Sequence, residues 1–169
     1  EVQWVETSGI YAGVDGLVTA KPGLILTLKV ADCVPVYFFN SQTNIIGLVH
    51  SGWRGTVNGI IQNTVNSIQK HGAYKEKILV YLGPSIGSCC YEVGAEVADS
   101  FYNEAKLEID DRKWKVDLHK QIRFQLIESG ISVTNIKASD ICTYESHACH
   151  SFRRDGIEAG RMYAFMALK

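Results

Sequence analysis

The 169-residue sequence predicts an α+β fold, a single domain with mixed β-sheets that begins with an antiparallel hairpin and is flanked by helices. Two observations support this prediction. Short apolar runs separated by turn residues fill positions 16–49, which is typical of antiparallel strands. Later apolar runs alternate with segments of helical periodicity, which is typical of a sheet covered by helices. No repeat, linker or low-complexity tract divides residues 1–169, so we expect one domain.

The early strands are expected at 16–19 and 24–30, with a turn at Lys21-Pro22-Gly23 between them. The hairpin follows, with strands at 35–39 and 45–49. If residues 40–43 form a four-residue loop, Phe39 pairs with Asn44 and Cys33 lies directly opposite His50. A slip of one residue would place these two side chains on opposite faces of the sheet.

The later elements are predicted from periodicity and capping residues. One helix is expected from Thr56, as its N-cap, to His71-Gly72, and a buried strand at 77–82. The spacing of Val93, Val97 and Phe101 predicts a second helix. A third helix is expected to begin after Asp117, as N-cap, and to end at Gly130. Further strands are expected at 133–137 and 162–168.

Composition and charge limit the function classes. The net charge of −1 and the absence of Lys/Arg runs give no reason to expect nucleic-acid binding. No apolar stretch approaches the roughly 20 residues of a membrane span, so no membrane partner is expected. The five cysteines, an odd number, favour a reducing and therefore cytoplasmic location. The first residues lack an initiator Met, and we expect an N-terminal segment to be missing from this chain.

The candidate catalytic residues lie at the two ends of the hairpin. Asp32 and Cys33 enter the first strand, and His50 leaves the second just before Trp53 and Arg54. A thiolate and an imidazole can share one Zn²⁺ ion. They can also form a nucleophilic Cys–His pair. A buried free cysteine beside a hydrogen-bonded histidine is the structural alternative.

Other segments carry possible chemistry with weaker patterns. The Gly83–Ser88 loop could bind an anion through backbone N–H groups, although a plain turn is favoured. Cys89 and Cys90 are expected to be packing residues. Arg153, Arg154 and Arg161 could form a positive wall, or be salt-bridged surface residues.

Four donors late in the chain offer a second metal-site hypothesis. Their Cys-x₄-His-x-Cys-His spacing matches no standard zinc motif, so we do not favour this site. The four residues are Cys142, His147, Cys149 and His150. His71 and His119 are expected to be solvated helix residues.

Five motifs, in order along the chain, resemble those of the laccase-domain proteins, also called the multicopper polyphenol oxidoreductase or YfiH/YlmD-like family. The motifs are Val30-Ala-Asp-Cys-Val-Pro-Val36, His50-Ser-Gly-Trp-Arg-Gly-Thr56, Leu82-Gly-Pro-Ser-Ile-Gly-Ser-Cys-Cys-Tyr-Glu-Val-Gly94, Asp140-Ile-Cys-Thr143, and Ser151-Phe-Arg-Arg-Asp-Gly156 with Gly160-Arg161.

This resemblance implies one zinc ion held by His, Cys and His. Cys33 and His50 match the second and third ligands, and the first is expected upstream of Glu1. The resemblance also implies phosphorolysis of adenosine, inosine and methylthioadenosine, and deamination of adenosine. Peptidoglycan-precursor editing has been assigned to bacterial relatives. Copper laccase activity is disfavoured, because five scattered histidines do not make the imidazole-rich cluster of a multicopper oxidase.

The resemblance and the residues together predict individual roles. Asp32 would accept or donate a proton, Arg54 and Arg154 would hold phosphate, and Trp53 would flank the purine base. The expected partners are a purine nucleoside and phosphate, and the oligomeric state stays open. Two alternatives remain: a cysteine hydrolase with Cys33 as nucleophile and His50 as base, and a binding or assembly module without enzymatic activity.

Overall fold

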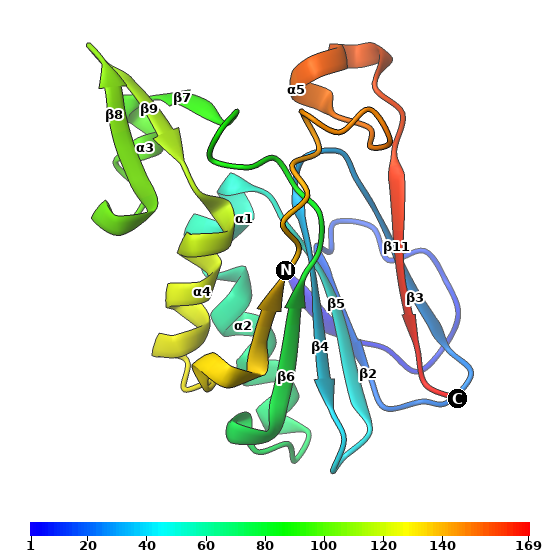
Figure 1. Cartoon of the computed structure of the whole chain (residues 1–169). Coiled ribbons are helices and arrows are strands. Elements are labelled where there is room, and N and C mark those ends of the chain that lie inside the picture. Colours follow the sequence, from blue (N-terminus) through cyan, green and yellow to red (C-terminus); the bar gives the residue numbers. More distant parts are fainter.

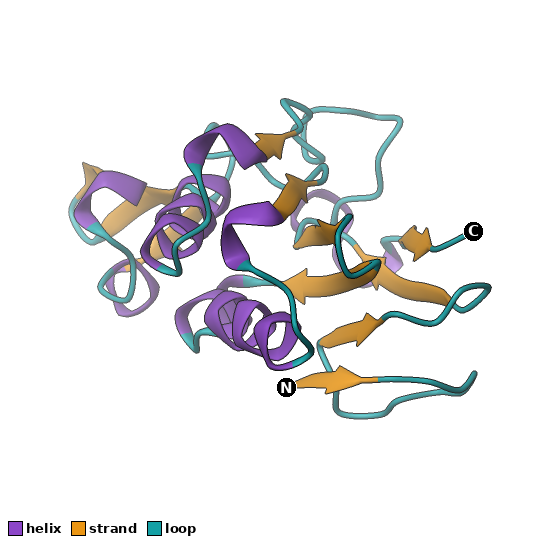
Figure 2. Ribbon diagram, turned by 90° about the horizontal axis from the view of Figure 1, so that it is seen from below, coloured by secondary structure: helices purple, strands orange, loops and turns teal.

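Three layers make up the fold in a computed structural model that describes residues 1–169 (Figure 1). The middle layer is a six-stranded mixed sheet in the order β1-β2-β5-β4-β6-β10. Its strands are β1 (Val2–Trp4), β2 (Gly16–Thr19), β5 (Ile45–Ser51), β4 (Val34–Asn40), β6 (Ile78–Leu82) and β10 (Ile136–Ala138). Figure 2 shows β1, which carries the N-terminus, at one edge of this sheet.

The other two layers cover the two faces of this sheet. On one side lie α1 (Trp53–Val57), α2 (Ile60–Lys70) and α4 (Leu118–Glu128), and on the other the antiparallel pair β3 (Ile25–Val30) and β11 (Met162–Ala167) (Figure 1). The remaining elements are β7 (Glu92–Gly94), α3 (Ala95–Ala98), β8 (Lys106–Asp110), β9 (Lys113–Val116), α5 (Phe152–Asp155), and 3₁₀ turns at Lys75–Lys77, Asn103–Ala105, Val133–Asn135 and Gly156–Glu158. The predicted α+β class is confirmed. None of the helices combines the length and apolar character needed to cross a membrane.

Strands β4 and β5 are apolar on both faces because the sheet is covered on both sides. Val36 and Phe38 of β4 belong to the large core between the sheet and the helices. Ile46 and Leu48 of β5 belong to a smaller core beneath β3 and β11. A strand buried on both faces reads as a continuous apolar run rather than as an alternating pattern. The hairpin is therefore the centre of the fold.

The register predicted for this hairpin is wrong by two residues. His50 pairs with Pro35 rather than Cys33, and Phe39 pairs with Ile46. The cause is Asn40, whose side-chain oxygen accepts the backbone N–H groups of residues 42 and 43 and so holds Asn40 at the end of β4. A shift of two residues keeps every side chain on its face. Cys33 and His50 are therefore diagonal neighbours on one face, not directly opposed.

The first predicted helix is divided into two. It begins at Trp53 instead of Thr56, and Gly59, with a φ of 79°, separates α1 from α2. Thr56 is not an N-cap: it lies inside α1, where its hydroxyl donates to the carbonyl of Gly52 at 2.8 Å. This early start matters for the site, because it places Trp53 and Arg54 on the first turn after β5.

Of the later predictions, the third helix is confirmed and the second is largely wrong. Asp117 caps α4 by accepting the N–H of Lys120 at 2.9 Å, and Gly130 follows with a φ of 88°. Val93, expected in a helix, pairs with Trp114 in a sheet of β7, β9 and β8 that was not predicted. The strand expected at 133–137 is a 3₁₀ turn followed by the three residues of β10, and the strand expected at 162–168 is confirmed as β11.

Candidate active site

A cleft of about 760 Å³ lies where β3 and β5 end and where β4 and α1 begin. Its volume falls in the range usual for small-molecule sites. The side chains that line it come from distant parts of the sequence. Those with polar or aromatic groups include Asp15, Asp32, Cys33, His50, Trp53, Arg54, Tyr91, Phe152, Arg153 and Arg161. Five of the predicted site residues, Asp32, Cys33, His50, Trp53 and Arg54, therefore line one cavity.

Cys33 and His50 converge on the space beside Gly52. A Cβ atom at Gly52 would lie 2.9 Å from the Cys33 sulfur and 3.7 Å from the His50 Cε1 atom. Both side chains thus point to one small volume that only a glycine leaves free. The convergence suits two ligands of one metal ion, and it also suits a thiol–imidazole pair.

A carboxylate lies close to the His50 ring. The Nδ1 atom of His50 is 3.7 Å from the Asp15 carboxylate. A metal-binding histidine commonly directs its second ring nitrogen toward a carboxylate. No third His, Cys, Asp or Glu of residues 1–169 joins Cys33 and His50 in a compact donor set. The chain therefore provides two ligands that fit zinc, with no third from its own residues.

The environment of Cys33 keeps its thiol protonated. Burial raises the pKa of Cys33 to about 11, the Asp32 carboxylate adds to this effect, and Arg161 opposes it. A thiolate is the nucleophilic form of cysteine, and its pKa must be low for it to form near neutrality. A bound cation would reverse the balance by stabilising the thiolate.

Asp32 is a buried anchor at the wall of the cleft. One carboxylate oxygen accepts the hydroxyl of Thr143 at 2.6 Å, and the other accepts the backbone N–H of Arg153 at 2.6 Å. The backbone of Asp32 has a φ of 81°, a left-handed conformation that is uncommon for residues other than glycine. Such conformations persist where the surrounding structure fixes them, often at functional sites.

Three arginines of the cleft each lie over an aromatic ring of the cleft. The guanidinium carbon is 4.3 Å from the ring centre for Arg54 over Trp53, 5.1 Å for Arg153 over Tyr91, and 5.9 Å for Arg161 over Phe152. Stacking on a ring holds a guanidinium in place. Nη1 of Arg153 also donates to the carbonyl of Glu92 at 2.6 Å, and Nη1 of Arg161 donates to those of Ala159 and Gly160 at 2.6 and 2.9 Å, so an anion would be bound by the remaining N–H groups of these two side chains. The cleft therefore combines flat apolar surfaces with fixed positive charge.

Arg154 does not line the cleft. Its guanidinium donates to the carbonyls of Thr143, Tyr144, Ser146 and Cys149 at 2.8–3.3 Å and pairs with Asp155. Those contacts use its donors to hold the 143–149 loop. Arg153 and Arg161 take the place in the cleft that the sequence suggested for Arg154.

The expectation that His71 and His119 are solvated is wrong for His119. Its Nε2 atom lies 3.0 Å from the Ser85 hydroxyl and 3.1 Å from the carbonyl of Gly83. Burial lowers the pKa of His119, although the Gly83 carbonyl and Asp117 act in the other direction. His71 is exposed, as expected, but its ring stacks on Trp4 with centroids 3.6 Å apart.

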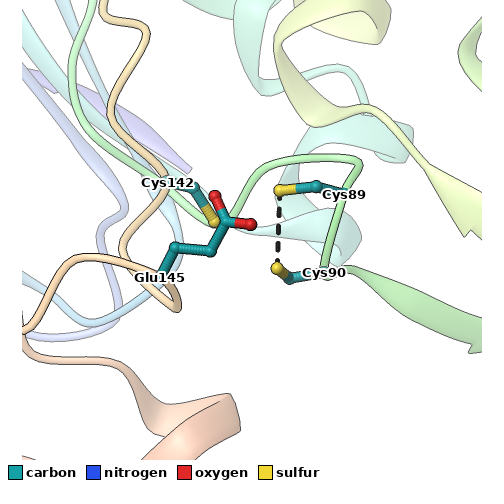
Figure 3. Close-up of side chains that lie close together, drawn as sticks. All are labelled: Cys89, Cys90, Cys142 and Glu145. Atoms are coloured by element: carbon teal, nitrogen blue, oxygen red, sulfur yellow. Dashed lines mark hydrogen bonds between the residues drawn. The ribbon is translucent and has the colours of Figure 1, made fainter.

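A second donor cluster lies outside the cleft. Cys89, Cys90, Cys142 and Glu145 have ligand atoms that all lie within 4.8 Å of one another, so this group could hold a metal ion (Figure 3). Cys90 packs against the core, as expected for a packing residue, whereas Cys89 is exposed. The alternative set of Cys142, His147, Cys149 and His150 does not form, because only Cys142 of these four joins the cluster.

The thiols of this cluster differ in their environments. Burial by itself would raise the pKa of Cys142. Backbone N–H groups that donate to its sulfur, including that of Gly87 at 3.2 Å, outweigh burial, so the pKa of Cys142 is lowered. Burial and the neighbouring thiols raise the pKa of Cys90 to about 12. The sequence carries no local signal for the cluster, which depends on the parallel pairing of β6 with β10, because parallel neighbours end at the same edge and bring residues 83–91 and 139–146 together.

The fold, the motifs and the cleft define a laccase-domain protein, and the comparison with known families agrees. The chain belongs to the multi-copper polyphenol oxidoreductase laccase family, whose sequence model matches residues 1–169. It is similar to the purine nucleoside phosphorylase YlmD of Geobacillus stearothermophilus, with 40% identity over 164 residues that cover 91% of this chain and 60% of that protein.

Two further relatives extend the comparison. The adenosine deaminase RL5 of an unknown prokaryotic organism is 35% identical over 94% of this chain and 63% of its own length. The crystal structure of YfiH from Bacillus licheniformis has a TM-score of 0.89 and 38% identity over 92% of this chain and 62% of that chain. The chain thus spans about three fifths of the length of these relatives. The family predicted from the motifs is confirmed.

Proposed function

We propose that this protein is a zinc-dependent purine nucleoside enzyme that cleaves adenosine, inosine or methylthioadenosine with phosphate, and that it also deaminates adenosine. The names of YlmD and RL5 support the two reactions. The observation that carries the proposal is the set of three arginine–aromatic pairs around the thiol and imidazole. A nucleoside has a flat base, which the aromatic rings can contact, and phosphate is an anion, which the guanidinium groups can bind.

The arginines of the cleft are proposed to bind phosphate. Arg54, Arg153 and Arg161 line the cavity, and a guanidinium can donate two parallel hydrogen bonds to one phosphate. Asp32 holds the backbone of Arg153 at 2.6 Å and so positions that wall. We do not assign phosphate to Arg154, because it does not line the cleft and both of its terminal nitrogens donate to backbone carbonyls or Asp155.

The proposed phosphorolysis forms one bond and breaks one. A phosphate oxygen attacks the ribose C1′ carbon while the C1′–N9 bond breaks, and the base leaves with that electron pair and takes up a proton. The products are ribose 1-phosphate and the free purine. Asp32 is proposed to exchange this proton, because it is a titratable residue among those that line the cleft, and Trp53 is proposed to flank the base.

Zinc is proposed at Cys33 and His50. When bound, it supplies Lewis-acid polarisation and an activated water for deamination. The third ligand is proposed to lie upstream of Glu1, and Glu1 itself lines the cleft, so a preceding residue would enter beside Asp15. The family description names copper, and a Cys/His site also binds copper. We propose zinc because His50 is the only histidine among the residues that line the cleft.

The cysteine hydrolase alternative has less support from the geometry. A pKa of about 11 leaves little thiolate at Cys33 near neutral pH. A chelator should abolish the activity of a zinc enzyme, whereas a cysteine hydrolase should keep its activity in chelator and lose it on alkylation.

We also propose a cytoplasmic location, with which the five free cysteines accord.

The test is an assay of adenosine with phosphate, using protein that includes any segment upstream of Glu1. Adenine and ribose 1-phosphate are expected as products, and inosine as the product of deamination. Arg54→Ala should raise the KM for phosphate at least about tenfold, since it removes a charge-assisted contact. Arg123→Ala on α4 is the matched control, because Arg123 does not line the cleft. Zinc-loaded protein that forms neither adenine nor inosine would contradict the proposal.

A further inference from the structure

The strongest unassigned feature is the thiol cluster outside the cleft, formed by Cys89, Cys90, Cys142 and Glu145 (Figure 3). Two segments supply it, one after β6 and one after β10. Figure 3 shows the Cys142 sulfur and the Glu145 carboxylate on one side, with the sulfurs of Cys89 and Cys90 facing them. We propose that this cluster is a second, structural zinc site of three thiolates and one carboxylate, which joins the two segments.

The geometry of the cluster suits a tetrahedral ion. With zinc–sulfur bonds of about 2.3 Å, two sulfurs of a tetrahedral site lie about 3.8 Å apart. The sulfurs of Cys89 and Cys90 are 3.4 Å apart, and no pair of ligand atoms in the cluster exceeds 4.8 Å. The spacing of the four donors is therefore within about 1 Å of the spacing in a tetrahedral site. Three soft sulfur donors select zinc over magnesium or calcium.

The backbone around the cluster is already arranged for a thiolate. The N–H of Gly87 donates to the Cys142 sulfur at 3.2 Å. A Cβ at Gly87 would lie 3.1 Å from the Cys89 sulfur and 3.5 Å from the Cys142 sulfur, so the absence of a side chain lets both approach. A site with four protein donors and no open position is typical of structural rather than catalytic zinc.

The same two segments hold Asp32. The N–H of Ile86 donates to the Asp32 carbonyl at 3.0 Å, and the Thr143 hydroxyl donates to the Asp32 carboxylate at 2.6 Å. The segments are tied to each other by the N–H of Thr143, which donates to the Ser85 carbonyl at 3.0 Å. An ion at the cluster would therefore fix the two segments that hold Asp32 at the wall of the cleft.

The test measures zinc binding to full-length chain in which Cys33→Ser and His50→Asn have removed the cleft ligands. Under reducing conditions, this background should bind one zinc and release protons from its thiols. Cobalt in place of zinc should give thiolate-to-metal absorption. Cys89→Ser should weaken zinc at least about a hundredfold, and Glu145→Gln about tenfold. Cys149→Ser, outside the cluster, is the matched control and should bind zinc like the background.

Two structural readouts need no enzyme activity. Zinc should protect Cys89, Cys90 and Cys142 from alkylation, and it should slow amide hydrogen exchange in segments 83–91 and 139–146. Cys89 is exposed, so Cys89→Ser should fold even if Cys142→Ser does not. Equal zinc affinity in the background and in Cys89→Ser would overturn the proposal, as would alkylation unchanged by zinc. Nucleoside turnover enters none of these measurements, so the proposed function and this site can fail separately.

Discussion

Gly52→Ala tests whether Cys33 and His50 act as one site. The added Cβ would lie 2.9 Å from the Cys33 sulfur, whereas ordinary contacts between such atoms are about 3.5–4.0 Å. The sulfur must therefore move by roughly 0.6–1.1 Å or adopt another rotamer. A displacement of about 1 Å in a catalytic group can lower activity about a hundredfold.

The backbone tolerates this substitution, which makes the effect specific. Gly52 has φ −80° and ψ 172°, an extended conformation that alanine adopts without strain. As the N-cap of α1, alanine in place of glycine costs up to about 1 kcal/mol, partly offset by the lower entropy of the unfolded chain. We expect a folded protein with a Tm close to that of the wild type, and zinc affinity and kcat/KM lowered about a hundredfold.

Gly55→Ala is the matched control, three residues further along. Its Cβ would meet the nearest atoms at 3.6 and 3.7 Å, which are ordinary contacts, and alanine within a helix is favoured over glycine by about 1 kcal/mol. Calorimetry, zinc competition and nucleoside kinetics on both variants complete the comparison. If Gly52→Ala kept zinc affinity and kcat/KM within about threefold of the wild type, the shared site at Cys33 and His50 would be refuted.

Four further predictions address the surroundings of the cleft. Thr143→Val removes one of the two hydrogen-bond donors to the Asp32 carboxylate, and urea unfolding should show a loss of about 1–3 kcal/mol; an unchanged midpoint would contradict the role of Asp32 as an anchor. Burial lowers the pKa of His119 below 6.5, so the unfolded chain takes up a proton more readily than the folded protein. The free energy of unfolding should therefore be highest above pH 6.5 and decrease as the pH falls below 6.5. His119→Gln should show a smaller fall in Tm between pH 7.5 and 5.5, and equal falls would refute this. Because burial raises the pKa of Cys33 to about 11, iodoacetamide should label it about a hundredfold more slowly in folded, metal-free protein than in urea, as peptide mass spectrometry would show. Arg154→Lys should lower the Tm, since an ammonium cannot span the four carbonyls; a Tm equal to that of the wild type would show that the 143–149 loop does not need this residue.

The central hairpin was predictable because its apolar runs and polar turn are unambiguous. The exact register was not, because Asn40 and Asn44 are both good turn residues. The outcome depends on the Asn40 side chain, which bonds into the turn, and on Asn44, which takes a φ of 50°. The error of two residues kept the faces correct, so the prediction that Cys33 and His50 meet did not depend on it.

The predictions failed where short elements depend on tertiary pairing. Val93, Val97 and Phe101 have helical spacing, but Val93 is held in β7 by Trp114 of β9. The pair Asn58-Gly59 is a turn signal within the first helix, and a strict interpretation of it would have predicted the break. The thiol cluster needed the knowledge that β10 lies beside β6, which no local pattern provides.

The left-handed backbone at Asp32 limits which amino acids can occupy that position. At a φ of 81°, glycine, asparagine and aspartate are the residues that fit with least strain. A library of all substitutions at position 32 should therefore return mainly glycine and asparagine among its folded members. Glycine keeps the chain path without any side chain, and asparagine keeps the shape without the charge. Comparing the two would separate what the carboxylate does for catalysis from what the backbone does for folding.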